Sequence, residues 1–514
     1  MPRKKLTALK ISQWLKEWDQ IAFDDKSKRR KPQSFFYFFT INATDLRKLS
    51  NIYRRVANKP RILDTGVQRD HKEERSQEIG YFIKGGYPWS ILSKRQRENP
   101  DHDKLKMPGW LPTSIIANIL APGTTISGKK VAEKDAVLIS ESIKGNYQIE
   151  LPDGFDKEEW KPDVFPLSII DGQHRLLAFD YLEDLKEDFE LPVVAFYNLD
   201  TTWQAYLFYT INIKPKKIKP SLAYDLFPLL RTQDWLEKSP DGLQVYRETR
   251  AQELTEILWA YKESPWYRRI NMLDQPGEGD VTQAAFIRTL LASMIKTSDV
   301  GSSYIGGLFG SQINDNDVIN WDRLQQGAFL VYSWQLLEKH LQDISDEWAQ
   351  SLRNAANQGT NIDLAFAGKT TLLATDQGVR AFLHVVNDMV FEEAGELDLN
   401  SIVVEDIDVG KREQILDEHE LDLDYLIDCI KSFENNKKLS AYLNDFISSM
   451  AHFDWRTSSA PGLDQEEKIK KMAFRGSGGY RELRRQILEF LVINASKPVK
   501  RVAKAVIDKL GYNS

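Results

Sequence analysis

The stretch Leu167–Phe179, LSIIDGQHRLLAF, brings together the side chains of this chain that are best suited to chemistry. An apolar run precedes Asp171 and Gly172, and apolar residues at helical spacing follow Arg175, so the pattern predicts a buried strand, a tight turn and a helix. The first backbone N–H groups of such a helix point toward one place and favour an anion there. Arg175 can add a bidentate guanidinium contact to the same anion. We therefore expect an anion site at this turn.

The five residues of the turn receive separate expected roles. Asp171 can hold a magnesium ion or order a bound water, although capping of the following helix is the alternative that we favour. Gln173 can position a water or donate to a phosphate oxygen. His174 has a pKa suited to general acid and base catalysis at neutral pH, and a packed, hydrogen-bonded histidine is the alternative. Gly172 and Arg175 are the expected phosphate-binding residues, with Arg175 the strongest candidate.

Further candidates lie on both sides of the turn in the sequence. Gln68 and Arg69 precede a predicted helix around Ile79–Ile83 that stops at Gly85 and Gly86, and there Arg69 can reach a phosphate or form a surface salt bridge. Asn212 ends a predicted helix over residues 203–211 and can close the other side of a pocket if that helix packs beside the turn. The lysines that follow it can contact nucleic acid, with solvent-facing lysines as the alternative: Lys214, Lys216 and Lys217.

Composition bounds the class of protein. A chain of 514 residues is too long for one core, and 42% hydrophobic residues allow most of it to fold. The single cysteine, Cys429, excludes an internal disulfide framework and a multi-cysteine metal site, and we expect it in a helix core. The N-terminus lacks the apolar segment of a signal peptide and no run is long enough to span a membrane, so we expect a cytoplasmic protein without membrane contact.

The charge is acidic overall but unevenly distributed. A net charge of −6 argues against a protein that binds nucleic acid by bulk charge alone. Basic clusters nevertheless occur at residues 3–5, 26–31, 214–219 and 497–509, whereas residues 396–428 are strongly acidic. Local contact with nucleic acid and ordinary solvated surface charge both fit these clusters.

Hydrophobic periodicity divides the chain into four parts. Residues 1–33 are expected to form a helical, basic arm, 34–238 an α/β domain, 239–395 a helical domain, and 396–514 an acidic segment followed by a helical region. The expected strands cover residues 114–120, 136–140, 147–151, 167–170 and 191–199. The expected later helices cover residues 245–262, 282–295, 321–341, 346–357 and 377–393.

Two stretches of the second half invite a nucleic-acid interpretation. The loop SPWYRRINML places Trp266 and Tyr267 beside Arg268 and Arg269, and arginines with aromatic neighbours suit phosphates and bases. The GSGG of residues 476–479 resembles a phosphate-cradling loop but lacks the ending of a P-loop, so a flexible helix start is the favoured interpretation. The arginines and tyrosine around it are a weaker candidate for nucleic-acid contact: Arg475, Tyr480, Arg481, Arg484 and Arg485.

The sequence resembles the DGQHR-domain family, which includes the DndB proteins of DNA phosphorothioation gene clusters. The resemblance lies in the literal DGQHR followed by LLAF, in the upstream VQR and EIGYFI, in the downstream INIKPKKIKPSLAYDL, and in the SPWYRRINML and VTQAAF pair. It implies an α+β fold, with a ParB/sulfiredoxin-like mixed α/β core followed by a mostly helical C-terminal half. It also implies ATP or another nucleoside triphosphate with Mg²⁺ at the DGQHR turn. The implied partners are DNA and the proteins of a DNA-modification or phage-defence system, with a homo-oligomer as a further option.

Three functions remain open from the sequence. The first is an accessory protein of such a system that binds a nucleoside triphosphate, with hydrolysis of that nucleotide (an ATPase or related NTPase activity) left open. The second is a non-enzymatic DNA-binding regulator, and the third is an assembly scaffold for a partner enzyme. The sequence contains no HExxH, GxSxG or GxGxxG motif, so zinc hydrolases, serine hydrolases and dinucleotide oxidoreductases are not indicated.

Overall fold

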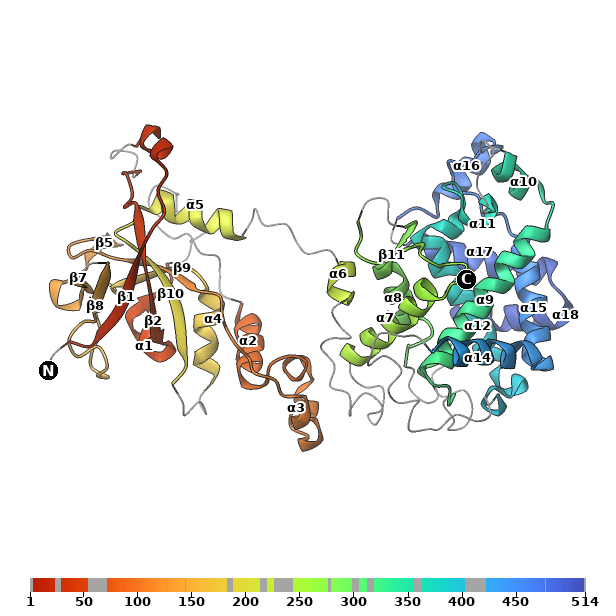
Figure 1. The fold of residues 1–514 in the computed structure, drawn as a ribbon, viewed down its shortest axis with the longest axis horizontal. Coiled ribbons are helices and arrows are strands. Elements are labelled where there is room, and N and C mark those ends of the chain that lie inside the picture. The colour runs from red at the N-terminus through yellow and green to blue at the C-terminus, as the bar shows by residue number, and fades with distance from the viewer. Residues whose placement is uncertain are drawn as a thin grey trace. The chain divides into compact units, whose positions relative to one another are not determined.

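The chain divides into two units, residues 1–217 and 218–514 (Figure 1). The computed structural model describes residues 3–23, 29–53, 72–126, 128–143, 145–182, 188–212, 220–225, 244–275, 279–297, 305–311, 319–354, 363–402, 422–476 and 478–512. The first unit mixes strands and helices, and the second is mostly helical. The coarse prediction of an α and β unit followed by a helical half is therefore confirmed. The domain boundary expected at residues 238–239 lies outside the described residues.

The first unit is organised around an eight-stranded mixed sheet in the order β3-β9-β4-β10-β2-β1-β8-β7. Its strands are β1 (Lys5–Ser12), β2 (Phe35–Asn42), β3 (Ser50–Asn51), β4 (Ile115–Ile119), β7 (Leu138–Ile143), β8 (Asn146–Glu150), β9 (Leu167–Asp171) and β10 (Glu190–Tyr197), and β5 (Thr125–Ile126) pairs with β6 (Lys129–Lys130) in a separate small sheet. Its helices are α1 (Ala43–Leu49), α2 (Glu73–Gly85), α3 (Lys94–Arg97), α4 (Gln173–Leu177) and α5 (Thr201–Asn212). Strands β4 and β10 lie inside the sheet, which fits their largely apolar sequences, and β9 lies between β4 and the two-residue edge strand β3.

The N-terminal segment is a strand, and the predicted helix of the arm is wrong. Residues Lys5–Ser12 form β1, in which Ala8 lies opposite Phe39 of β2 on one side and Tyr147 of β8 on the other. Two partner strands from distant parts of the sequence satisfy the backbone here, and such pairing overrides a weak local helical pattern. Only a short 3-10 turn, η1 (Lys16–Gln20), follows it.

Local signals place β2, α1 and α2 as expected. Strand β2 alternates buried and less buried residues, with Tyr37, Phe39 and Ile41 inside. The Asn42 side chain then accepts a hydrogen bond from the Thr44 amide at 2.9 Å and begins α1. Helix α2 ends at Gly85 with Gly86 as its C-cap, as the sequence predicts.

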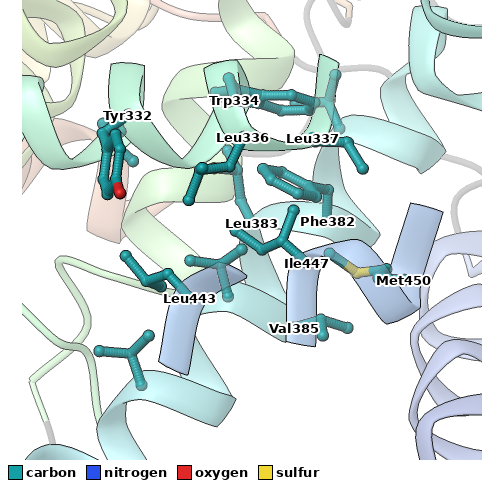
Figure 2. Close-up of a cluster of buried hydrophobic side chains, with 14 of the residues drawn as sticks. Tyr332, Trp334, Leu336, Leu337, Phe382, Leu383, Val385, Leu443, Ile447 and Met450 are labelled. Carbon is teal, nitrogen blue, oxygen red and sulfur yellow. The ribbon is translucent and has the colours of Figure 1, made fainter. Parts of the chain in front are cut away.

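The second unit is built from helices around one large apolar core. Its elements are α6 (Pro220–Asp225), α7 (Gln244–Ala260), β11 (Ile270–Asn271), β12 (Val281–Thr282), α8 (Gln283–Ala292), α9 (Arg323–Asp343), α10 (Glu347–Asn354), α11 (Leu364–Ala367), α12 (Asp376–Leu397), α14 (Leu423–Asn435), α15 (Lys437–Ala451), α16 (Gln465–Met472), α17 (Gly479–Asn494) and α18 (Lys497–Leu510). The five helices expected between residues 245 and 393 correspond to α7, α8, α9, α10 and α12. Figure 2 shows side chains of α9, α12 and α15 meeting in the core, where the Trp334 and Phe382 ring centroids are 3.9 Å apart. Cys429 is fully buried, as expected.

One charged cluster lies inside this helical core. The Asp388 carboxylate accepts from Arg484 at 2.5 Å, and the two side chains are almost completely buried. Burial raises the pKa of Asp388, and the arginine opposes that shift. One turn earlier on α12, burial first and then the charge of Arg484 hold the pKa of His384 well below its usual value. His384 is therefore a neutral ring in the folded protein at neutral pH.

Candidate functional site

The DGQHR turn connects β9 to α4 as the sequence predicts. Gly172 begins the helix in a left-handed conformation, with φ of 94°, which glycine adopts without steric cost. A Cβ on this residue would lie 2.6 Å from Cδ1 of Ile115 on the neighbouring strand β4. The turn therefore requires glycine for its backbone conformation and for its close packing.

The carboxylate of Asp171 is held from two directions. Its Oδ2 accepts from Nη2 of Arg175 at 2.8 Å, and its Oδ1 accepts from Nδ2 of Asn212 at 2.9 Å. The favoured expectation that Asp171 caps the helix is wrong, because α4 begins at Gly172 without a side-chain cap. The structure does bring Asn212, at the end of α5, to the motif. The result is a partly exposed, anchored carboxylate at the carboxyl end of β9, the strand next to the edge of the sheet.

The guanidinium of Arg175 bonds groups of the protein itself. Its Nη1 donates to the carbonyl oxygen and hydroxyl of Thr113 at 2.6 and 2.5 Å, and to the Ser114 carbonyl at 3.2 Å. Its side chain is only 19% exposed. Burial lowers the pKa of the guanidinium from its very high usual value, and the charge of Asp171 opposes that shift. A phosphate would have to compete with these internal acceptors, so the contacts that the structure gives Arg175 are those of a positioning residue.

Gln173 and His174 point into the protein. They are 4% and 7% exposed, and His174 Nδ1 lies 3.4 Å from the Ser76 hydroxyl on α2. The packed, hydrogen-bonded histidine is therefore the alternative that matches the structure. The Oε1 of Gln173 is buried and has no hydrogen-bond partner among the described residues. An acceptor in that position can receive a hydrogen bond from a bound water or ligand group.

Several predicted residues fall outside this arrangement. Gln68, Arg69, Lys214, Lys216 and Lys217 lie outside the described residues. Sequence reasoning missed Thr113 and Ser114, which anchor Arg175. They lie more than 60 residues before it, and no pattern in the sequence links them to the motif.

In the second unit, the expected arginines contact their own neighbours. Arg268 stacks over Trp259, with 3.8 Å between the guanidinium carbon and the ring centroid. Arg269 bonds the Pro265 carbonyl and Asp280. Trp266 is completely buried in the helical core, so the suggestion that it touches nucleic acid is wrong.

Two arginines of the GSGG region, Arg484 and Arg485, are also paired with carboxylates of the protein. Gly479 begins α17, and the Tyr480 ring lies over His384 with centroids 5.5 Å apart. Arg484 pairs with Asp388, and Arg485 bonds carboxylates of its own helix. The helix-start interpretation of GSGG fits these contacts better than a phosphate loop.

The described residues contain no group of three or more histidine, cysteine, aspartate or glutamate side chains that could hold a metal ion. No helix in the described part of the chain is long and apolar enough to cross a membrane. Comparisons of the chain with protein-family models, with curated proteins and with solved structures found no match. The resemblance to the DGQHR-domain family therefore rests on the sequence motifs.

Proposed function

We propose that this protein is a DGQHR-family accessory protein of a DNA-modification or phage-defence system, and that its first unit binds a nucleoside triphosphate with Mg²⁺ beside Asp171. The single observation that carries the proposal is the Asp171 carboxylate, fixed by Arg175 and Asn212 at the end of β9. A ParB/sulfiredoxin-like core is part of the same proposal. Ligands of open α/β sheets usually bind at such strand ends.

The donor set fits a magnesium nucleotide. Mg²⁺ in nucleotide sites usually takes one or two carboxylates, with phosphates and waters completing its shell. A carboxylate has about four acceptor positions, and two hydrogen bonds leave Asp171 free to accept further partners. Asp171 would hold the ion, which would neutralise phosphate charge when bound. Arg175 and Asn212 would keep the carboxylate oriented.

Calorimetric titration with ATP, CTP and GTP, each with magnesium and with EDTA, tests this proposal. We expect one nucleotide to bind in magnesium, and Asp171→Asn to weaken that binding about tenfold or more, because a charge-assisted contact contributes about 1.5–3 kcal/mol. Asp180→Asn is the matched control, since Asp180 also pairs with an arginine, Arg47, on the surface of the same unit. Equal affinities for the two variants, or no binding of any nucleotide, would contradict the proposal.

A non-enzymatic DNA-binding regulator is the second candidate. The observation that favours it is the set of basic clusters in a chain whose net charge is −6, together with the guanidinium of Arg175, which already bonds Asp171 and Thr113 and is not needed for a nucleotide. A regulator would bind duplex DNA with an affinity that falls steeply as salt rises. The absence of any shift with promoter DNA at low salt would eliminate this candidate.

A further inference from the structure

A cavity of about 360 Å³ lies in the first unit, away from Asp171. Its walls come from the segment after β1, from the end of β10 and from the first half of α5, which lies near that segment (Figure 1). This volume is at the lower end of the range for small-molecule sites, and apolar surface makes up most of the lining. The cavity can therefore take one flat group of modest size.

The cavity is walled by a continuous series of aromatic rings. Successive centroids are 5.5 Å apart for Trp18 and Trp14, 6.2 Å for Trp14 and Phe23, 6.2 Å for Phe23 and Trp203, and 6.0 Å for Trp203 and Tyr206. The rings meet at varied angles, between 31° and 87°, so they present both faces and edges. Such walls suit a planar aromatic ligand, which can stack on one ring and meet the edge of another.

This aromatic surface is unusually open. Helix α5 carries Trp203, Tyr206, Leu207 and Phe208, yet none of its twelve residues is fully buried. Tyr206 is 57% exposed and Trp18 is 39% exposed. A cluster of large, exposed apolar side chains often marks a binding site for a ligand or a partner.

Cations surround the same rings. The Arg29 guanidinium lies 5.1 Å from the centroid of Trp203, and the Lys31 ammonium lies 5.3 Å from that of Trp14. Lys31 also pairs with Asp19 at 2.6 Å, while its side chain stays 52% exposed to solvent. Arg30 pairs with Asp200 at the start of α5. Residues 10–36 contain seven lysines or arginines against four aspartates or glutamates, in a chain whose net charge is −6. This local excess favours an anionic ligand and disfavours a quaternary ammonium, which aromatic cavities otherwise bind.

We propose that this cavity binds an unpaired nucleobase of a single-stranded nucleic acid, with Arg29 and Lys31 meeting the flanking phosphates. Aromatic stacking combined with a basic rim is the way in which proteins hold single strands. Apart from tryptophan and tyrosine, the polar side chains that line the cavity are Gln13 and Gln33, and an amide can both donate to and accept from a base edge. The site should therefore tolerate several bases. This inference extends the proposed function by naming the form of the nucleic acid, and it does not rest on nucleotide binding at Asp171.

Fluorescence anisotropy with the full chain tests the proposal, in EDTA and without free nucleotide, so that failure of the Asp171 site cannot affect the result. The probes are labelled oligo-dT, oligo-U, an abasic strand of equal length and a blunt duplex, all at low salt. We expect oligo-dT or oligo-U to bind about tenfold or more tightly than the abasic strand, since stacking contributes that much per base. Equal binding of the abasic strand, or no binding of either single strand, would overturn the proposal.

Two tyrosines on α5 provide a matched pair of variants. Tyr206 lines the cavity, whereas Tyr209, three residues later and also exposed, does not. We expect Tyr206→Ala to weaken oligonucleotide binding about tenfold and Tyr209→Ala to leave it unchanged. Trp18→Ala, which removes the ring at the other end of the aromatic series, should act like Tyr206→Ala. Equal affinities for Tyr206→Ala and Tyr209→Ala, with circular dichroism showing both folded, would show that the bound strand does not use this cavity.

Discussion

Replacement of Gly172 by alanine tests whether the turn is as closely packed as the structure indicates. The backbone there has φ of 94°, and the new Cβ would lie 2.6 Å from Cδ1 of Ile115 and 3.1 Å from Nη2 of Arg175. Ile115 is fully buried, so its methyl group has little room to move. The substitution therefore adds a steric cost to a conformational cost.

The two costs can be estimated and separated. An L-residue in the left-handed region loses about 1–2 kcal/mol, and overpacking a buried site costs a further 1–3 kcal/mol or so. We expect Gly172→Ala to lower the free energy of unfolding of the first unit by about 2–5 kcal/mol. Gly145→Ala is the control, because Gly145 has a similar φ of 88° but no described atom within 4 Å of the place that a new methyl group would occupy. Only the conformational cost applies there.

Urea unfolding followed by peptide-resolved hydrogen exchange measures both variants. Peptides of the first unit report the loss, and peptides of the second unit provide an internal reference within the same molecules. The close-packing argument fails if Gly172→Ala loses no more stability than Gly145→Ala. In that case the Ile115 side chain can move aside at little cost, and its packing does not fix the turn against strand β4.

Three further predictions concern the helical unit. Asp388→Asn should destabilise it by about 3 kcal/mol or more in urea unfolding, because Arg484 stays buried without its carboxylate; retained stability would mean that the ion pair is not formed. The lowered pKa of His384 means that its ring binds a proton more readily in the unfolded chain, so its contribution to stability is present above pH 6.5 or so and is lost as the pH falls below that value. The stability of this unit, followed from neutral to mildly acidic pH, should fall less steeply in His384→Gln, and an unchanged slope would contradict the assignment of a neutral ring. Trp334→Ala should cost about 3–5 kcal/mol by calorimetry, whereas the exposed Ile493→Ala should change stability by less than about 0.5 kcal/mol.

The sequence predicts well the elements whose signals are local. The apolar run of β9, the glycine of the turn and the periodic residues after Arg175 lie within about a dozen residues. The strand, the turn and the start of the helix form where expected, and α4 gives way to a 3-10 turn after Leu177. The long helices of the second unit are predicted for the same reason. Strand β1 is not predicted by the sequence, because its conformation depends on pairing with β2 and with β8, and β8 lies more than 130 residues away.

In the candidate site, too, the sequence predicts contacts that follow from local structure and misses contacts between distant segments. Asn212 lies beside Asp171 because it is the last residue of α5. The sequence predicts this contact on the condition that the helix packs beside the turn, and it does. The partners of Arg175 could not be foreseen, because the carbonyl groups of Thr113 and Ser114 carry no sequence signal. An arginine in a turn looks the same in sequence whether it meets a phosphate or a backbone carbonyl.

Helix α5 has a place in both proposed sites. Its first half carries Trp203 and Tyr206 in the aromatic cavity, and its last residue, Asn212, bonds Asp171. A helix of twelve residues is about 18 Å long and moves nearly as a rigid rod. A base that displaces the rod at one end would alter the orientation of Asp171 at the other. The two affinities are then linked thermodynamically. If the single strand changes the affinity for the nucleotide by some factor, the nucleotide changes the affinity for the single strand by the same factor.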